Sequence, residues 1–430
     1  MTSSVDGLIS GLSTSALISQ LMQVEAAPQT QLKTKVSNEQ KVVAAYQSIN
    51  TKLAALQKAA EDLSAKTTWS SVKATSSSDA VTASAANGAV TGNATFNVTS
   101  LARGQVSTAV VAGTGSVVAG GSLTVTIGSG DPVTIDVSAD PSAAGVAKAI
   151  NAKGLDLKAA VITTSTGDTV LQLTSTKTGT ANAFTVTGLD APVKNAVTAV
   201  DARVEVGDPA TGGYAVTSSS NTFTNLMSGV TLTVKRVEND VTVDVSADAD
   251  AIAAKTQAFV DAANNALKEI SKQSAWSQGG TTNGPLVGDY MVRELTDRVL
   301  GTVSSGLAGY GSFKQVGVQL DRDGNLKFDK DAFAKAYAAD PAAAERGAAG
   351  LGAAMTTMAE TAQKNVTSST QSRNKLVDNL NDQIAAWDVR LTARQTALQK
   401  QFSNLEVALG KLQSQSSWLS GQLAGLSSGS

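Results

Sequence analysis

Hydrophobic side chains recur at alternating three- and four-residue steps along residues 377–426. A repeat averaging 3.5 residues keeps one stripe of a helix turned toward a partner, so the pattern predicts a left-handed coiled coil. At 1.5 Å per residue this helix would be roughly 70 Å long, which is typical of a leg rather than of a globular domain. The expected core positions are Leu380, Ile384, Trp387, Leu391, Leu398, Phe402, Leu405 and Leu409, followed by Leu412, Leu419, Leu423 and Leu426, with Trp418 just off the stripe.

The N-terminal residues carry a second set of helical repeats. A short amphipathic helix is expected after the capping candidates Ser13, Thr14 and Ser15, and Pro28 should end or kink it because proline cannot donate to the preceding turn. A longer helix follows over residues 31–63. The apolar positions are Leu8, Leu12, Leu17, Leu21 and Met22 in the first segment and Tyr46, Ile49, Leu53, Leu56 and Leu63 in the second.

The two apolar stripes lie at opposite ends of one chain. The most economical arrangement pairs them with each other, antiparallel or in a small bundle, and the alternative pairs each stripe between subunits. The C-terminal repeat is longer than the N-terminal one. Its end, residues 412–426, is therefore expected to be an interaction surface that becomes ordered on assembly.

The residues between the helical ends alternate polar and apolar side chains, which is the period of a β-strand. Asn87-Gly88 is a hairpin signal within this region. A β-β-α-β-β block interrupts the alternation over about 112–190. The predicted domains are a leg of residues 1–69, a head domain A of residues 70–111 and 196–249, an inserted α+β head domain B of residues 112–195, and a helical part with a hairpin and the C-terminal coiled coil, residues 250–430.

The predicted fold class is therefore multidomain α+β. A long helical coiled-coil leg is formed by both termini, and two small β-rich head domains are nested between them. No apolar run approaches the roughly 18 residues of a membrane span, and the N-terminus lacks the charged and apolar regions of a Sec-type signal peptide.

Composition argues against most catalytic and nucleic-acid functions. The chain contains no cysteine and no histidine, so it lacks the thiol nucleophile, the commonest general base and the commonest zinc ligand. Its formal net charge is −2 and its pI is about 5.4, whereas phosphate binding requires a basic surface. We therefore expect no enzyme activity, no cofactor, no bound metal and no nucleic-acid partner.

Three local motifs are weak. Asp321, Asp323 and Asn325 resemble the first ligands of a calcium loop, but Gly324 and Ala332 stand where that loop needs other residues, so the motif indicates a β-turn. The glycines near residues 113–121 fit no phosphate-binding pattern. The Asn-x-Thr triplets in this threonine-rich chain are expected by chance.

Several ordered motifs together resemble the flagellar filament cap family, hook-associated protein 2. The opening segment matches the start of that family. Residues 218–234, with Asn221 and Gly229, resemble a second block of that family. The Gly-Pro-Leu-Val-Gly-Asp stretch at 284–289 resembles a third block, and residues 316–341 resemble a fourth. The matching N-terminal positions are Gly7, Leu8, Ser10, Gly11, Leu12, Leu17, Ile18, Leu21, Met22, Glu25 and Pro28.

This resemblance implies a structural protein exported through the flagellar type III channel. It implies an extracellular homo-oligomeric ring of four to six subunits at the filament tip that promotes flagellin polymerisation, with flagellin and an export chaperone as partners. At 430 residues the chain is expected to lack the extra head domain of some members. By the same resemblance Leu8, Leu12, Leu17, Leu21, Met22, Leu412, Trp418, Leu419, Leu423 and Leu426 are the expected assembly residues.

Two alternatives remain at the level of sequence. The first is a surface adhesin whose head domains bind host mucin or glycans, although no aromatic-rich platform for sugars stands out. The second is a hook-filament junction protein, which would also have coiled termini. The stretch at 284–289 favours the cap over the junction protein.

Overall fold

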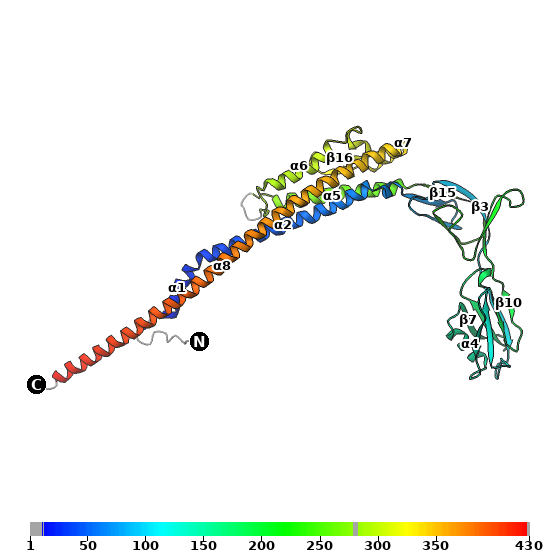
Figure 1. Cartoon of the computed structure of the whole chain (residues 1–430), viewed down its shortest axis with the longest axis horizontal. Coiled ribbons are helices and arrows are strands. Elements are labelled where there is room, and N and C mark those ends of the chain that lie inside the picture. The colour runs from blue at the N-terminus through cyan, green and yellow to red at the C-terminus, as the bar shows by residue number, and fades with distance from the viewer. Residues whose placement is uncertain (1–10, 12, 278–282, 428–430) are drawn as a thin grey trace. The chain divides into compact units, whose positions relative to one another are not determined.

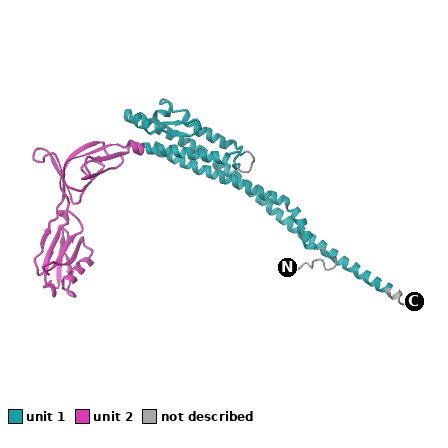
Figure 2. Ribbon diagram, turned by 180° about the vertical axis from the view of Figure 1, so that it is seen from behind, with its two compact units in different colours: residues 1–65, 253–430 teal, residues 66–252 magenta. Residues whose placement is uncertain are grey.

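The computed structural model describes residues 11, 13–277 and 283–427, with side chains described as far as residue 423 (Figure 1). The chain divides into two compact units (Figure 2). The first, helical unit consists of Met1–Ala65 and Ala253–Ser430, and the second, β-rich unit is Lys66–Ile252. Nested β-rich domains between helical termini are thus confirmed as the fold class.

Long helices dominate the helical unit. A short hairpin of β16 (Val318–Leu320) and β17 (Leu326–Phe328) follows the 3₁₀ turn η2 (Phe313–Val316). The stripe that begins at residue 377 belongs to a longer continuous helix, which starts at Pro341 and has 87 residues. The helices are α1 (Thr14–Glu25), α2 (Ala27–Ser64), α5 (Ala249–Ser274), α6 (Tyr290–Ser304), α7 (Lys330–Ala339) and α8 (Pro341–Ser427).

Helices α2 and α8 run antiparallel, as their side-chain contacts show. Near the end of α2, the side-chain Oε1 of Gln57 accepts from Nε2 of Gln363 in α8. Toward the start of α2, Glu39 pairs with Arg373, and further still the helix reaches Asp388 through Gln29. Partners therefore move toward the C-terminus of α8 as α2 is followed back to its start (Figure 1).

The core residues of α2 pack into a bundle rather than into a two-stranded coil. Tyr46, Ile49 and Leu53 lie in one cluster with Ala362 and Val366 of α8, and this cluster also holds Ile270, Leu286, Val292 and Leu295. The section of α8 that faces this part of α2 therefore precedes residue 377. Its apolar positions follow three- and four-residue steps, but most are alanines, so they lack the leucine pattern: Ala344, Ala348, Leu351, Met355, Ala359, Ala362 and Val366.

Close approach of α2 and α8 depends on Gly352. A Cβ at this position would lie 2.6 Å from the Ala60 carbonyl oxygen and 3.0 Å from the Ser64 nitrogen, both backbone atoms that cannot rotate away. We expect Gly352→Ala to lower the free energy of unfolding by about 1–3 kcal/mol, because the helices must separate. Urea unfolding, followed by the helical circular dichroism signal, measures this change.

Gly301→Ala in α6 is the matched control for that substitution. Nothing lies within 4 Å of a Cβ at Gly301. The alanine there should stabilise the helix by up to about 1 kcal/mol through propensity alone. Equal effects of the two substitutions would contradict the close-approach argument.

The first β-rich module contains a five-stranded sheet and a three-stranded sheet. The sheets have the strand orders β1-β15-β3-β11-β12 and β13-β14-β2, and they share one apolar core. The strands are β1 (Val72–Ser76), β2 (Val81–Ala85), β3 (Gly92–Ser100), β11 (Ala202–Val206), β12 (Tyr214–Ser218), β13 (Thr222–Phe223), β14 (Val230–Val234) and β15 (Glu238–Ala247), after the one-turn helix α3 (Lys66–Trp69).

The Asn87-Gly88 hairpin prediction is wrong. Gly88 has a positive φ of 80° and lies in a turn, but the flanking strands do not pair with each other. Strand β2 pairs with β14, and β3 pairs with β15 and β11. The dipeptide therefore carries the chain from one sheet to the other. Pairing with strands some 150 residues away overrides the local signal.

The second β-rich module is inserted between β3 and β11. Its sheets have the orders β10-β4-β8-β7 and β6-β5-β9, and α4 (Ala143–Ala152) contributes to their shared core. Strand β4 belongs to this module, whereas the sequence pattern predicts it as part of head domain A, residues 70–111. The strands are β4 (Val106–Val111), β5 (Ser122–Ile127), β6 (Val133–Asp136), β7 (Leu157–Thr163), β8 (Thr169–Ser175), β9 (Phe184–Thr187) and β10 (Lys194–Val197), with the 3₁₀ turn η1 (Thr180–Asn182).

Candidate assembly surface

Helix α1 packs one face on α8 and leaves an apolar face in solvent. Its buried side chains are Thr14 and Ile18, and Met22 is half-buried. These positions recur every four residues, so they form one side of the helix. The exposed apolar side chains are Leu17, Leu21 and Val24.

The C-terminal part of α8 extends past the start of α1 (Figure 1). Leu398 is the last buried apolar residue of α8 among the described side chains, and Phe402 and Leu409 are half-buried. The residues that follow on the same helix face are exposed. We call Leu405, Leu412, Leu419 and Leu423 the distal stripe, and Trp418 lies beside it.

The exposure of the distal stripe is large for such side chains. Leu405 is 47% exposed, Leu412 60% and Trp418 65%. An extended row of exposed leucines marks a protein interaction site. The heptad spacing of the row fits a helical partner, because each leucine can insert between four side chains of a facing helix.

Charge is scarce on this part of α8. The last charged side chains are Lys400, Glu406 and Lys411, and residues 412–430 contain none. A partner that bound here would be held by apolar burial and by neutral Ser and Gln side chains. Its binding should depend little on salt, because screening acts on charges.

The residues predicted for the leg core fall into three groups. Tyr46, Ile49, Leu53, Leu56, Leu63, Leu380 and Leu398 are buried, Ile384, Trp387, Leu391, Phe402 and Leu409 are half-buried, and Leu405 is exposed. Among the assembly candidates, Leu17, Leu21, Leu412, Trp418, Leu419 and Leu423 are exposed and Met22 is half-buried. Leu8 and Leu12 lie outside the described residues, as does the side chain of Leu426.

Sequence reasoning missed several contributors to this surface. Val24 extends the exposed apolar face of α1, Val407 is an exposed apolar residue of α8, and Ile18 is a buried contact of α1. Gln29 was also overlooked, although it is buried. Its position three residues before Leu32 and seven before Val36 was the available signal, because that spacing places a polar side chain on the apolar face.

The motif at residues 284–289 packs against the helical bundle through Leu286. Leu286 is buried in the cluster around Ile49. Asp289 is the N-cap of α6, where one carboxylate oxygen accepts from the backbone nitrogens of Met291 and Val292. Its other oxygen accepts from the Tyr46 hydroxyl of α2. The motif therefore joins α6 to α2 and acts through the fold.

The Tyr46 contact predicts a pH dependence. Burial, and next the hydrogen bond to Asp289, raise the pKa of Tyr46 well above its ordinary value. The unfolded tyrosine ionises near pH 10 while the folded one stays protonated. Its stabilising contribution is thus fully present below about pH 10 and is lost as pH rises above that value.

Tyr46→Phe is expected to cost about 1–2 kcal/mol of unfolding free energy at pH 7, because the hydrogen bond to a carboxylate is lost. Above about pH 10 the gap between the two proteins should narrow, since only the natural chain has the ionising phenol. Urea unfolding between pH 7 and 11 at fixed salt measures this gap. A gap that stays constant to pH 11 would rule out the proposed coupling.

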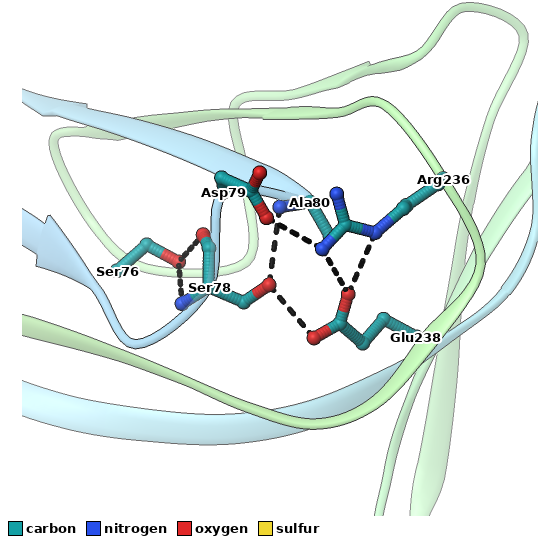
Figure 3. Close-up of polar contacts among 6 residues, drawn as sticks. All are labelled: Ser76, Ser78, Asp79, Ala80, Arg236 and Glu238. Carbon is teal, nitrogen blue, oxygen red and sulfur yellow. Dashed lines mark hydrogen bonds and ion pairs between the residues drawn. The ribbon is translucent and has the colours of Figure 1, made fainter.

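A polar cluster in the β-rich unit has its charges paired with one another. In the first β-rich module, Arg236 pairs with Asp79 and Glu238, and the Ser78 hydroxyl donates to Glu238 (Figure 3). The Arg236 guanidinium lowers the pKa of the Asp79 carboxyl. The cluster ties the β1–β2 loop to the segment before β15 and leaves no unpaired charge for a ligand.

The calcium-like aspartates form a turn instead of a metal site. One Asp321 carboxylate oxygen accepts from the backbone nitrogens of Asp323 and Asn325, 2.9 Å and 2.8 Å away. Over the described residues, no group of three acidic side chains could hold a metal ion. No described helix is long and apolar enough to cross a membrane.

Two family models match most of the chain. The model for the flagellar hook-associated protein 2 C-terminus matches residues 199–414. The model for the flagellar hook-associated protein 2 N-terminus matches residues 10–105. Both matches include parts of the helical and the β-rich units, whereas most of the inserted module lies between them.

Individual relatives agree with the family models. The chain is 27% identical to the flagellar hook-associated protein 2 of Escherichia coli K12, with 97% of each chain covered. It is 30% identical to the lateral flagellar hook-associated protein 2 of Vibrio parahaemolyticus, over 66% of this chain and 67% of the relative. The crystal structure of the flagellar cap protein FliD D1-D2-D3 domains from Escherichia coli aligns with a TM-score of 0.58 and 25% identity, covering 77% of this chain and 99% of that one.

Proposed function

The chain belongs to the flagellar hook-associated protein 2 family, and we propose that it is the filament cap that assembles as a homo-oligomeric ring and promotes flagellin polymerisation. The fold supports this proposal, because both termini meet in a helical leg and the β-rich modules are nested between them. The observation that carries it is the distal stripe. A row of exposed leucines along a helix marks a surface that a partner covers.

The partners follow from the chemistry of that stripe. The distal stripe and the exposed face of α1 contact flagellin subunits and neighbouring copies of the chain through apolar burial. The protein acts outside the cell at the filament tip and reaches it by flagellar export, aided by an export chaperone. The adhesin alternative gains no support from the comparisons, and the structure adds no aromatic platform for sugars within its described residues.

Complementation of a bacterial strain that lacks its own cap tests the proposal. Expression of this chain should restore filaments in electron micrographs and should lower the amount of flagellin released into the medium as monomer. The purified protein should also form rings that can be counted in projection. The proposal fails if the chain neither restores filaments nor forms a closed oligomer at any protein concentration tested.

A further inference from the structure

A buried amide lies where α2 begins to contact α8. Gln29 is the third residue of α2 and is only 5% exposed. Along the helix it continues the apolar positions Leu32 and Val36. Burial of an amide is unfavourable unless its polar atoms are hydrogen-bonded. Its presence in an apolar stripe therefore calls for a specific partner.

Both ends of the Gln29 amide are bonded. Its Nε2 donates to Asp388 Oδ1 at 2.5 Å and to the Ile384 carbonyl oxygen at 3.4 Å. Its Oε1 accepts from Lys33 Nζ at 3.2 Å. The bond to Asp388 has a charged acceptor, which makes it stronger than a neutral bond. The amide thus fastens the first turn of α2 to one position on α8.

At the junction before Gln29, the Ala26 N–H donates to the Met22 carbonyl oxygen, and the Ala26 carbonyl oxygen accepts from the Thr30 N–H. Helix α1 ends at Glu25 and α2 starts at Ala27, and Pro28 has no N–H to continue the ladder between them. Helix α1 has 12 residues, and isolated helices of this length are marginal in water. Its placement therefore draws on contacts with α8 as well as on the junction with α2.

Met22 is half-buried on the side of α1 that faces α8. Thr14 and Ile18 are buried, and Glu25 Oε1 lies 3.3 Å from Arg394 Nε in a solvent-exposed ion pair, a type that contributes little. From the Glu25–Arg394 pair back toward its start, α1 runs antiparallel to α8. Leu398 of α8 therefore lies opposite α1. The position of α1 therefore depends on a fixed starting point for α2.

We propose that Gln29 is a positioning residue for the assembly surface. Its bond to Asp388 holds the break between the two helices against α8 and so keeps α1 in place, with Leu17 and Leu21 exposed near the start of the distal stripe. The use of this surface in assembly rests on the proposed function. The positioning itself does not, because it is a property of the free monomer.

Hydrogen exchange of the full-length monomer, followed by mass spectrometry, tests the positioning. In Gln29→Ala the amides of residues 14–25 should exchange about tenfold faster or more, because a charge-assisted bond is lost. The amides of residues 45–63, which lie in the bundle, should keep their natural rates. Unchanged exchange in α1, or equal acceleration from residue 14 to residue 63, would overturn the proposal.

Two further variants separate the hydrogen bond from simple packing. Asp388→Asn retains a carbonyl oxygen as acceptor and should leave α1 exchange within about twofold of the natural rate, whereas Asp388→Leu should reproduce Gln29→Ala. Gln31→Ala, at an exposed position of the same turn, is the matched control and should change nothing. Acceleration of α1 exchange by Asp388→Asn as large as that caused by Asp388→Leu would contradict the assigned bond. The exchange measurement needs no filament. A failed complementation test would therefore not change the result for the positioning of α1.

Discussion

Replacing Leu412, Leu419 and Leu423 together by glutamate is expected to abolish filament growth while the monomer keeps its natural stability. The three leucines lie on one face of α8 and are exposed, so no core is disturbed when they change. Three carboxylates that must leave water when a partner covers them cost far more than the apolar contacts they replace. Complementation of a cap-deficient strain, scored by filament length, measures the loss, and thermal unfolding of the purified protein checks the fold.

A control that adds two negative charges to the opposite face separates the leucine face from added charge. Ser414 and Ser417 point to the opposite side of the same helix segment, where both are exposed. Ser414→Glu with Ser417→Glu should support nearly normal filaments. Filaments of ordinary length from the triple leucine variant would exclude the distal stripe as the assembly surface, and loss of filaments in both variants would indicate an effect of charge alone.

Leu53→Ala is expected to be the most destabilising of the single substitutions considered, at about 3–4 kcal/mol of unfolding free energy. Leu53 has no exposed surface and lies at the centre of the cluster formed by α2, α6 and α8. Its truncation removes apolar contacts and leaves a cavity between rigid helices. Urea unfolding of the full chain, followed by the helical circular dichroism signal, measures the change.

Leu405→Ala is the informative comparison, because the N-terminal repeat predicts Leu53 and the C-terminal repeat predicts Leu405 as core residues of the leg. Leu405 is 47% exposed in the monomer. Its replacement should change the unfolding free energy by about 0.5 kcal/mol or less, as is usual for surface positions. A cost equal to that of Leu53→Ala would show that a partner covers Leu405 even in the purified protein.

Much of the architecture follows from local patterns. The 3.5-residue repeat near each terminus predicts helices, and alternation between residues 72 and 247 predicts strands, because each period turns one set of side chains toward a core. The nesting of strands between helices follows from the order of these patterns. Absent histidine and cysteine likewise direct attention to binding rather than to catalysis.

The pairing of these elements was decided only in three dimensions. The part of α8 before residue 377 has no leucine repeat, yet Ala362 and Val366 cover Tyr46, Ile49 and Leu53. Gly352 lets α8 approach the backbone near the end of α2 closely. Asn87-Gly88 is a turn whose flanking strands take distant partners instead. Such choices depend on which surfaces fit together, and a local window contains only one of the two surfaces.

The leucines of the C-terminal repeat show most clearly which features the sequence determines and which the tertiary structure decides. The sequence by itself determined that residues 377–426 form a helix with one apolar stripe, since period and side-chain type suffice for that. The unequal lengths of the two repeats also predicted that residues 412–426 extend past the partner helix, but they did not determine that Leu405, expected in the core, is already exposed. Burial depends on where α1 lies along α8, and that position is fixed by tertiary contacts such as the bond from Gln29 to Asp388.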